Sequence, residues 1–526
     1  MTPRSRIAPL DVVWRTCDAV PECLGVACAP YGRCLAHLTP VESAGVLRGL
    51  VPGQSLDLRG TVLPEDLLTR VLDGVERRLG RARFDHAVFP GPARFAEVVF
   101  AGDATFDHAR FERLASFYGA RFLRNLSFRQ ARFLRELSLH DAQVGGHAAF
   151  DRVTVRGDAL FSEARFGGAR FGGAPFGGAP PGRTGTASFQ GTRFHGFATF
   201  DAAVIHGDAA FRGARFHRAV SFRGSGWESG ADFQGARFEG AAYLGPMRIA
   251  RRLSLAGVRA RASLHLDTGT GTGGCRVVLR SAVLARLTAR LSDAEVDLRN
   301  ATLAGPSAVT RRAGRLRVTS LDGLDADVLT LTGADLRGCG LGGLRRPEGL
   351  RLRECLFAAP PGGLGLRLGW PPVRWWSRRR VIADEHLWRG WPPEADGRTA
   401  VPAADSAPGA APDPARLAAV YERLRPGVDD ARVAADFAFG AMEMRRLGSA
   451  RGRARLLLSL YWLACGYGLR AGRALGWLTL VAALAAGAVG WTAMARPAGK
   501  HGVQRARVAV VRPAASASRP AHNAGG

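Results

Sequence analysis

Four cysteines and one histidine crowd into a short segment near the N-terminus, "CDAVPECLGVACAPYGRCLAHL". They are Cys17, Cys23, Cys28, Cys34 and His37. Zinc takes four sulfur or nitrogen ligands at tetrahedral angles, and the spacing of Cys34 and His37 presents two of them on one side of a helix start. We predict a Cys₃His zinc site that Cys17 and Cys23 complete, with Cys28 as the substitute for either of them.

Five residues separate Cys17 from Cys23, which is more than a usual zinc pair has, so free buried or redox-active thiols are the alternative. The first twenty residues contain no continuous apolar core of a secretory signal, which predicts a cytosolic N-terminal part. In that reducing compartment the eight cysteines favour a metal site over disulfides. We expect residues 1–50 to form a zinc knuckle, which is too small to fold without its metal.

Large apolar residues at a regular spacing dominate the next two hundred positions. Two registers step by eleven residues, one through Phe84, Phe95, Phe106, Phe117, Phe128, Leu139, Phe150 and Phe161, the other through Phe89, Phe100, Phe111, Phe122, Phe133, Val144, Val155 and Phe166. After a Gly/Pro-rich interruption at residues 177–187 they resume from Phe189 and Phe194. A helix face needs apolar residues three and four apart, and a strand needs them two apart. Neither fits, so the chain is an internal repeat.

A small residue, usually Ala, stands two positions before most of these anchors, and the residue between the two is often Arg. Residues two apart in extended chain point the same way, so the small and the large side chain share one interior while the Arg faces water. Gly and Asp in the gaps, as at residues 101–103, 156–158 and 206–208, tolerate the backbone angles of tight corners. These features predict a narrow solenoid of short extended faces.

The A-x-F-x-x pattern resembles the pentapeptide-repeat proteins. The resemblance covers about residues 55–355, with pure five-residue steps at Phe161, Phe166, Phe171 and Phe176 and a leucine version at Leu331, Leu336 and Leu341. It implies a mainly β fold, a right-handed quadrilateral β-helix with the large and the small residue pointing inward. One extra residue at every second face departs from the family pattern, and we interpret it as a bulged corner. We therefore expect coils of about twenty-two residues, stacked about 4.8 Å apart.

We expect the β-helix to occupy residues 82–360, preceded at 51–81 by a capping strand and an amphipathic helix from about Glu65 to Leu79. Residues 361–391 mix Arg with four tryptophans, Trp375, Trp376, Trp388 and Trp391. That composition suits a membrane interface or stacking on nucleic acid, but we favour a helix that caps the last coil. The Pro/Ala/Asp-rich residues 392–414 are typical of a flexible linker.

Residues 475–495 contain no charged side chain, and such a helix is long enough to cross about 30 Å of hydrocarbon. We predict a transmembrane helix there, with Trp477 and Trp491 as interfacial anchors. A helical juxtamembrane region at 415–474, with helices near 415–425 and 429–447 and an interfacial helix near 456–468, precedes it, and a disordered basic tail at 496–526 follows.

Arginines before the span, together with the absent signal, predict a single-pass cell-membrane protein whose N-terminal bulk is cytoplasmic. The GYG at residues 466–468 is also found in potassium-channel filters, but a filter needs spans on both sides and only one span is predicted. The segment from about 436 to 475 and the Cys/His-rich N-terminus are similar to those of bacterial membrane-anchored pentapeptide-repeat proteins.

The chain has 73 Lys and Arg against 45 Asp and Glu. This excess fits either a solvated surface or an affinity for phosphate-bearing partners. Mimicry of DNA, as some pentapeptide-repeat proteins show, would need an acidic rod, so a nucleic acid could only be a ligand here.

No phosphate loop, catalytic triad or metal-hydrolase signature is present, and the histidines are scattered at outward positions. We therefore predict a non-enzymatic, membrane-anchored scaffold that binds an unidentified protein partner. Nucleic-acid or topoisomerase binding is the alternative, and nothing in the sequence indicates an oligomeric state.

Overall fold

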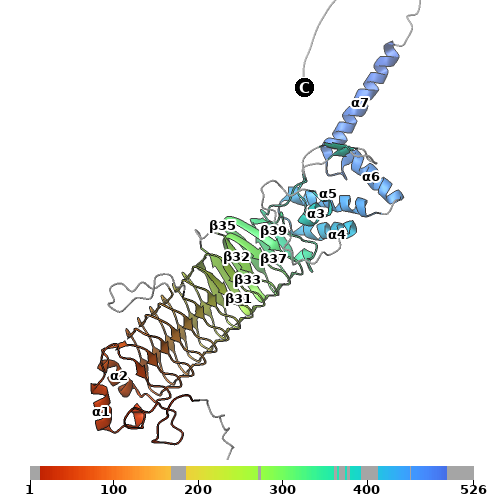
Figure 1. Ribbon diagram of the computed structural model, residues 1–526. Helices are drawn as coiled ribbons and strands as arrows, with labels where there is room; N and C mark the ends of the chain where they lie inside the picture. Colours follow the sequence, from red (N-terminus) through yellow and green to blue (C-terminus); the bar gives the residue numbers. More distant parts are fainter. Residues whose placement is uncertain are drawn as a thin grey trace, which may run out of the picture. The chain divides into compact units, whose positions relative to one another are not determined.

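The computed structural model describes residues 12–167, 185–269, 274–360, 364–366, 373–375, 379–391, 413–449 and 452–494. The chain divides into two compact units, Met1–Leu458 and Ser459–Gly526. The first unit is a parallel β-solenoid with helices at both of its ends (Figure 1). The predicted fold class is therefore confirmed.

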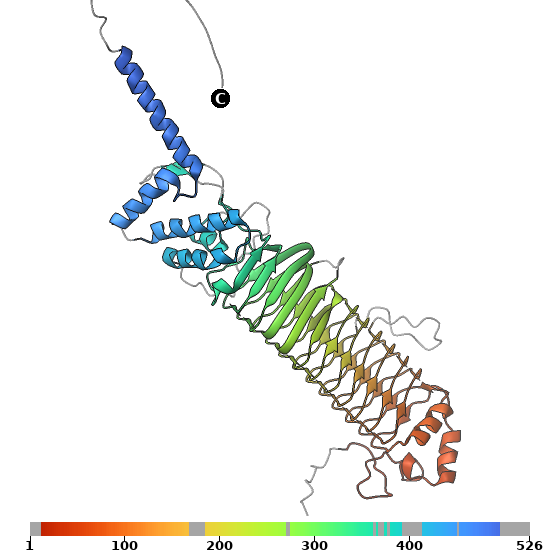
Figure 2. The same ribbon diagram turned by 180° about the vertical axis from the view of Figure 1, so that it is seen from behind.

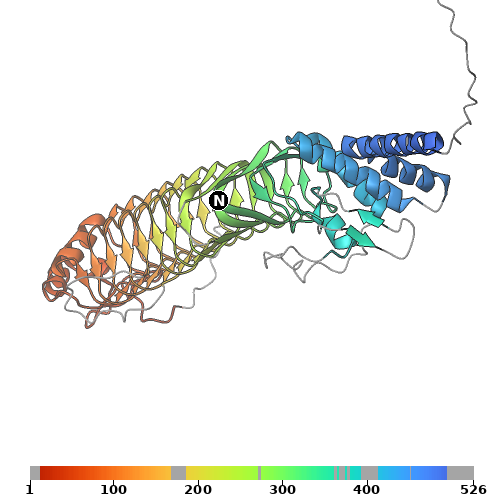
Figure 3. The ribbon, with the colours of Figure 1, turned by 90° about the horizontal axis from the view of Figure 1, so that it is seen from above.

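Four stacks of short parallel strands form the sides of the solenoid, and its coils lie one above the next in Figures 2 and 3. The first face contains β1 (Leu56–Asp57), β3 (Ala82–Arg83), β7 (Ala104–Thr105), β11 (Leu126–Ser127), β15 (Ala148–Ala149), β19 (Ala187–Ser188), β23 (Ala209–Ala210), β27 (Gly230–Asp232), β30 (Arg252–Ser254) and β32 (Cys275–Val278). The second contains β4 (Val88–Phe89), β8 (Arg110–Phe111), β12 (Arg132–Phe133), β16 (Thr154–Val155), β20 (Arg193–Phe194), β24 (Arg215–Phe216) and β28 (Arg237–Phe238).

The third face contains β5 (Ala93–Arg94), β9 (Ala115–Ser116), β13 (Leu137–Ser138), β17 (Ala159–Leu160), β21 (Ala198–Thr199) and β25 (Val220–Ser221). The fourth contains β2 (Arg78–Leu79), β6 (Val99–Phe100), β10 (Arg121–Phe122), β14 (Gln143–Val144), β18 (Arg165–Phe166), β22 (Val204–Ile205) and β26 (Gly226–Trp227). The register advances by twenty-two residues per coil, as predicted: Ala82 pairs with Ala104, and Ala104 with Leu126.

The interior is a continuous stack of phenylalanine rings. Phe106 lies parallel to Phe84 and to Phe128, with ring centroids 4.8 Å apart in both pairs. It meets Phe95 and Phe117 edge-on at 5.5 and 5.4 Å. Phe106, Phe117 and Phe128 are all fully buried. Stacked and edge-to-face contacts are the favoured geometries of aromatic pairs, so one ring per face fills the narrow interior.

Two kinds of corner explain the eleven-residue step. The five-residue corner from Phe84 to Phe89 turns through His86, whose φ is +60°, and the Ala87 N–H donates to the Phe84 carbonyl at 3.0 Å. The six-residue corner that follows Phe100 contains the extra residue and needs no left-handed backbone. There Gly102 passes so close to the preceding coil that an added Cβ would lie 2.7 Å from the Arg81 nitrogen.

Ala148 of β15 pairs with Ala187 of β19, which lies thirty-nine residues further along the chain instead of twenty-two. The extra residues fall between β18 and β19. The seventeen additional residues match positions 168–184, which lie outside the described residues. The predicted five-residue steps at Phe171 and Phe176 fall there. The core continues across this insertion, because the Phe189 ring stacks on the Phe150 ring with centroids 4.7 Å apart.

Beyond Ala242 the corners straighten and the strands lengthen. The longer strands are β29 (Ala242–Ile249), β31 (Arg259–Thr268), β33 (Val283–Asp297), β35 (Ser307–Ser320), β37 (Leu329–Thr332) and β39 (Leu350–Arg353). Between them β34 (Thr302–Leu303), β36 (Asp325–Ala326) and β38 (Ala334–Asp335) stay short. β29 pairs with both β25 and β26, so one strand now runs along two faces. Leucine and valine replace phenylalanine inside these coils, and their smaller side chains fit a different cross-section.

The N-terminal end of the solenoid is covered by α1 (Pro40–Arg48), which follows the 3₁₀ helix η1 (Leu35–His37), and by α2 (Glu65–Gly74). Thr39 and Glu42 form a capping box at the start of α1. The predicted helix from Glu65 to Leu79 ends at Gly74, because Glu76 and Arg77 adopt left-handed backbone angles and the chain enters β2. β1 pairs in register with β3, so the first coil begins at Leu56.

At the other end lie η2 (Pro347–Gly349), α3 (Ala383–Trp388), α4 (Pro414–Leu424), η3 (Arg425–Gly427) and α5 (Ala431–Gly448), with the antiparallel pair β40 (Leu364–Leu366) and β41 (Val373–Trp375). Val428 adds a parallel bridge to Leu352 of β39, and the Asp429 N–H donates to the Leu352 carbonyl at 3.2 Å. These contacts seal the edge of the last coil. The predicted linker falls almost entirely outside the described residues, which resume at Asp413.

The second unit contains the end of α6 (Arg453–Cys465) and the long helix α7 (Ala471–Met494). Residues 472–489 of α7 have a mean hydropathy of 1.5, and none of them is buried. One helix of the described chain is therefore long and apolar enough to cross a membrane. The Trp477 indole donates to the Leu463 carbonyl at 2.9 Å, which ties α7 back to α6. The predicted basic tail lies outside the described residues.

Candidate metal centre

The structure brings Cys17, Cys23, Cys34 and His37 together. An antiparallel bridge between Thr16 and Val26 folds the segment back on itself, and the Cys17 N–H donates to the Gly25 carbonyl at 2.7 Å. Cys34 is the N-cap of η1, and this single turn places His37 on the same side as Cys34. Local turns therefore position all four side chains.

The donor atoms have the spacing of a tetrahedral zinc site. All four lie within 4.8 Å of one another. The sulfurs of Cys23 and Cys34 are 3.8 Å apart, and the His37 Nδ1 lies 3.3 Å from the Cys17 sulfur and 3.4 Å from the Cys34 sulfur. Zinc–sulfur bonds of about 2.3 Å and zinc–nitrogen bonds of about 2.0 Å at tetrahedral angles give separations of about 3.8 Å and about 3.6 Å. The residues present fit this ion.

The thiols of the cluster influence one another's protonation. Burial raises the pKa of Cys17, but the N–H groups of Cys34 and Ala19 and the ring of His37 outweigh it and lower that pKa to about 6. Burial and the neighbouring Cys23 and Cys17 raise the pKa of Cys34 to about 12. One thiolate thus forms readily while a second meets repulsion, which a divalent cation between them would remove.

Two further residues define the limits of the site. Cys28, the predicted substitute ligand, is not a member of the cluster, because its backbone forms a bridge with Arg33. Burial raises the pKa of its thiol. Gly25 passes directly over the cluster, and an added Cβ would lie 2.7 Å from the Cβ of Cys34. Only glycine fits at that position without displacing a ligand.

The cluster is fixed to the first coil by a contact that the sequence analysis did not identify. The Arg59 guanidinium lies 4.6 Å from the centre of the Trp14 ring, and Trp14 also packs against His86 at 5.8 Å. The Val26 N–H donates to the Arg59 carbonyl at 2.8 Å. An aromatic residue just ahead of a cysteine cluster is the only sequence signal for this docking.

The histidines of the described solenoid coils lie on its outside, as expected for solvated residues. His86 stacks on His108 at 4.6 Å, and His195 stacks on His217 at 4.5 Å. Burial, followed by the neighbouring histidine, lowers the pKa of His86 and of His195. The stacks arise because equivalent positions of successive coils lie directly above one another.

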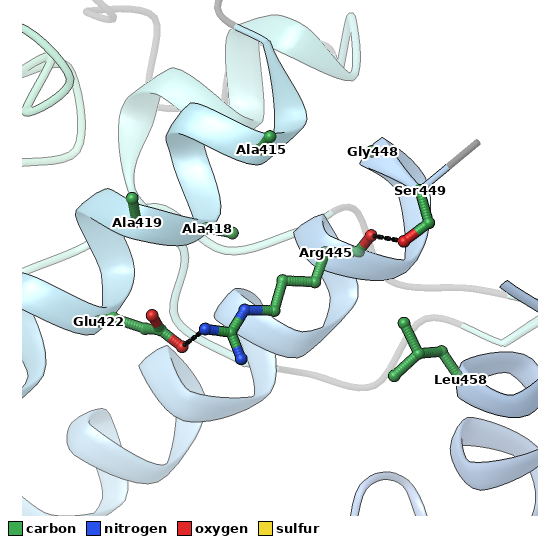
Figure 4. A pocket seen from close by; sticks show the side chains of 8 residues that line it. All are labelled: Ala415, Ala418, Ala419, Glu422, Arg445, Gly448, Ser449 and Leu458. Carbon is green, nitrogen blue, oxygen red and sulfur yellow. Dashed lines mark hydrogen bonds and ion pairs between the residues drawn. The ribbon is translucent and has the colours of Figure 1, made fainter. Parts of the chain in front are cut away.

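A hollow of about 420 Å³ opens between α4 and α5 (Figure 4). It is lined mainly by small residues, and its two charged side chains, Glu422 and Arg445, are paired with each other at 2.6 Å. The Ser449 hydroxyl donates to the Arg445 carbonyl at 2.7 Å. No base lies beside that hydroxyl in the lining, so the hollow has no arrangement for nucleophilic catalysis.

A buried ionic cluster joins the helices of the C-terminal end. Glu385 is fully buried, forms ion pairs with Arg379 and Arg389, and accepts a hydrogen bond from the Tyr421 hydroxyl at 2.6 Å. Burial raises the pKa of Glu385, but the two arginines outweigh it and lower that pKa. Sequence analysis missed this cluster because its members are up to forty-two residues apart.

These observations define the class of the protein: a capped parallel β-solenoid with a Cys/His-rich N-terminal segment. The family of pentapeptide repeats matches residues 84–132, 106–154, 139–180, 184–226 and 203–247, and its description is "Pentapeptide repeats (9 copies)". The chain therefore carries a pentapeptide-repeat solenoid. Searches of curated proteins and of solved structures returned no significant match.

Proposed function

We propose that the protein is a non-enzymatic scaffold, anchored in the cell membrane by α7, whose solenoid sides bind another protein. The observation that carries the proposal is the closure of both solenoid ends. At the C-terminal end the half-buried Asp384 accepts hydrogen bonds from the N–H groups of Leu341 and Gly342, at 2.6 and 3.2 Å. At the N-terminal end α2 buries its apolar face. The long sides are then the surface left for a partner.

The absence of an assembled reaction site within the described residues supports the non-enzymatic part. There, the N-terminal cluster is the one group of three or more His, Cys, Asp or Glu side chains placed to share a metal ion. Four protein ligands leave zinc no open coordination position, which is the arrangement of structural and not of catalytic sites. We infer that bound zinc stabilises the knuckle and, through Trp14, the first coil.

The apolar surface of α7 supports a single pass through the membrane. Its leucines and tryptophans are exposed in the structure, which is unfavourable in water and favourable in lipid. We propose that the solenoid lies on the cytoplasmic side. The free thiols of the N-terminal cluster persist there, and Arg453, Arg455, Arg470 and Arg473 precede the span.

Membrane anchoring is tested by alkaline carbonate extraction of membranes from cells that express the full chain. We expect the protein to stay in the pellet, and protease added to spheroplasts to leave the solenoid intact. Release into the supernatant would refute the anchor, and digestion of the solenoid would refute the orientation.

Zinc binding is tested by metal analysis of the full chain purified without added metal. We expect one zinc per chain, which Cys34→Ser or His37→Ala abolishes. Cys28→Ser is the matched control, because this thiol lies a few residues away but outside the cluster, and it should retain the zinc. Native protein without zinc would exclude the site.

The scaffold is tested by placing a photocrosslinking residue at one outward position on each of the four faces in living cells. A discrete crosslinked protein on one face supports the proposal, and no crosslink on any face contradicts it.

Nucleic-acid binding is the second candidate, and the net charge of +28 favours it. It predicts gel retention that falls steeply with salt, whereas no retention at low salt would dismiss it.

A further inference from the structure

The outward side of the second face carries arginine in four consecutive coils. The register pairs Arg193 with Arg215, Arg215 with Arg237, and Arg237 with Arg259 at the start of β31. Three of the four side chains are exposed, and that of Arg215 is half-buried. We call these four residues the arginine column. Because successive coils are about 4.8 Å apart, the column is a straight row of closely spaced positive charges.

Within the described residues no ion pair joins the column to a carboxylate. Glu239 lies nearby, and its pKa is lowered by the hydrogen bond with His217 and then by Arg261 and Arg215. Arg156 and Arg261 lie on the same face at the next outward position, and they add positive charge at its two ends. Glu239 is the acidic residue among them, and its carboxylate accepts a hydrogen bond from His217 at 2.8 Å. The pKa of His195 is lowered by burial, by His217 and then by Arg156 and Arg193, which indicates a positive potential at this face.

The fourth face, across the coil, has a different arrangement. At its equivalent positions no two arginines are adjacent; the order is Arg78, Val99, Arg121, Gln143, Arg165, Val204, Gly226 and Arg248. Like charges directly opposite one another on neighbouring strands are destabilising. The fourth face avoids this repulsion and the second face accumulates it. An anionic partner that relieves the repulsion would therefore bind the second face selectively.

We propose that the arginine column docks against the anionic phospholipid headgroups of the membrane, an inference that rests on the proposed anchoring by α7. Guanidinium groups bind phosphate oxygens in a bidentate manner, and a flat row of them matches a flat array of headgroups. The anchor keeps the solenoid within reach of that surface.

Lipid is favoured over nucleic acid by the residues beside the column. Binding of single strands relies on exposed aromatic rings on which bases stack. At the neighbouring outward positions of these coils the structure has Arg156, His195, His217, Glu239 and Arg261, and the two histidine rings are already stacked on each other. Phe197, an exposed ring at the adjacent corner, already contacts the Arg218 guanidinium at 5.9 Å, so the charged groups favour phosphate over bases.

The experiment uses the full chain in nanodiscs of phosphatidylcholine alone or mixed with phosphatidylglycerol. Phenylglyoxal modifies accessible arginines, and mass spectrometry reports the rate at each position. In the anionic nanodiscs we expect modification of the column to slow about fivefold, as about 1 kcal/mol per arginine at an anionic surface implies. The arginines of the fourth face should react equally in both lipids. High salt should abolish the difference.

Two variants distinguish an effect of the arginine column from an effect of the overall positive charge. Arg193→Ser, Arg215→Ser, Arg237→Ser and Arg259→Ser together should remove the lipid-dependent protection of Arg156 and Arg261. The matched control replaces Arg78, Arg121, Arg165 and Arg248 by Ser, removes the same charge and should keep that protection.

Equal reactivity of the column in both lipids, with the chain incorporated, would overturn the inference while the anchor stands. Failure of the chain to enter the nanodiscs would refute the anchor, and with it the inference. Protection of the column by added single-stranded DNA instead of lipid would overturn the inference in favour of nucleic acid.

Discussion

Replacement of Phe106 by Ala tests the central physical feature of the solenoid, the stacked aromatic interior. The Phe106 ring is fully buried and stacks on rings in the coils below and above. It also contacts Phe95 and Phe117 on the opposite face, and Phe100 and Phe111 on the two neighbouring faces. Truncation of a buried Phe to Ala costs about 3–5 kcal/mol, and each aromatic pair contributes about 0.5–1.5 kcal/mol beyond its buried area. Six such pairs are lost, so we expect a value near the upper end, about 4–5 kcal/mol.

The destabilisation should be local. Each coil of a solenoid contacts its neighbours and little else, so the free energy of local unfolding should decrease mainly for the coils beside Phe106. About 4 kcal/mol corresponds to roughly a thousandfold faster amide exchange where opening limits the rate. Hydrogen exchange of the full chain in detergent, followed by mass spectrometry, should show this increase in residues 84–128 and little change in residues 200–238.

The matched control is Phe197→Ala. Phe197 is 49% exposed and contacts Arg218 at 5.9 Å, so its loss should change stability by less than about 0.5 kcal/mol. Equal exchange in the two variants would refute the reasoning. So would an increase spread uniformly over all coils, because it would mean that the solenoid opens as one cooperative unit.

Two further predictions concern buried contacts. Asp297 is nearly inaccessible and is paired with Arg280 and Arg299, so Asp297→Asn should destabilise the chain by about 3 kcal/mol. Burial raises the pKa of Asp297, but the arginines outweigh it and lower that pKa. The stabilisation is therefore complete above the unfolded pKa of about 3.9 and is lost as pH falls through the lower folded value. Thermal unfolding between pH 2 and 6 should show a flatter pH dependence in the variant, and parallel curves would contradict this. Gly25→Ala should weaken zinc binding in competition with a chelator, whereas Gly45→Ala, whose added Cβ meets nothing within 4 Å, should leave it unchanged.

The repeat could be predicted because its signal is local and repeated. A small residue stands two positions before most anchor phenylalanines, so both face the interior, and this pattern recurs every eleven residues from Phe84 onward. The twenty-two-residue coil followed from the same count. The helix that begins at Glu65 was predicted, but its end at Gly74 was not, because that end depends on left-handed backbone angles. The straightened corners beyond Ala242 were not predicted either, because they depend on the width of the core beneath them.

The candidate metal centre was predictable in part for a similar reason. Cys34 and His37 are three residues apart, and one turn of helix brings them together whatever the rest of the chain does. The exclusion of Cys28 could not be read from spacing, because it depends on the bridge that its backbone forms with Arg33. The docking of Trp14 on Arg59 joins residues forty-five positions apart and leaves no periodic trace.

The amino-acid sequence by itself determined which side chains form the interior and that Cys34 can meet His37, because short-range spacing controls both. The tertiary structure alone decided which side chains outside the repeat become neighbours. Trp14 contacts Arg59 of the first coil, and Glu385 meets Tyr421 from another helix. Such neighbours depend on how coils stack and helices pack, and the free energy of those contacts comes from residues distant in the sequence.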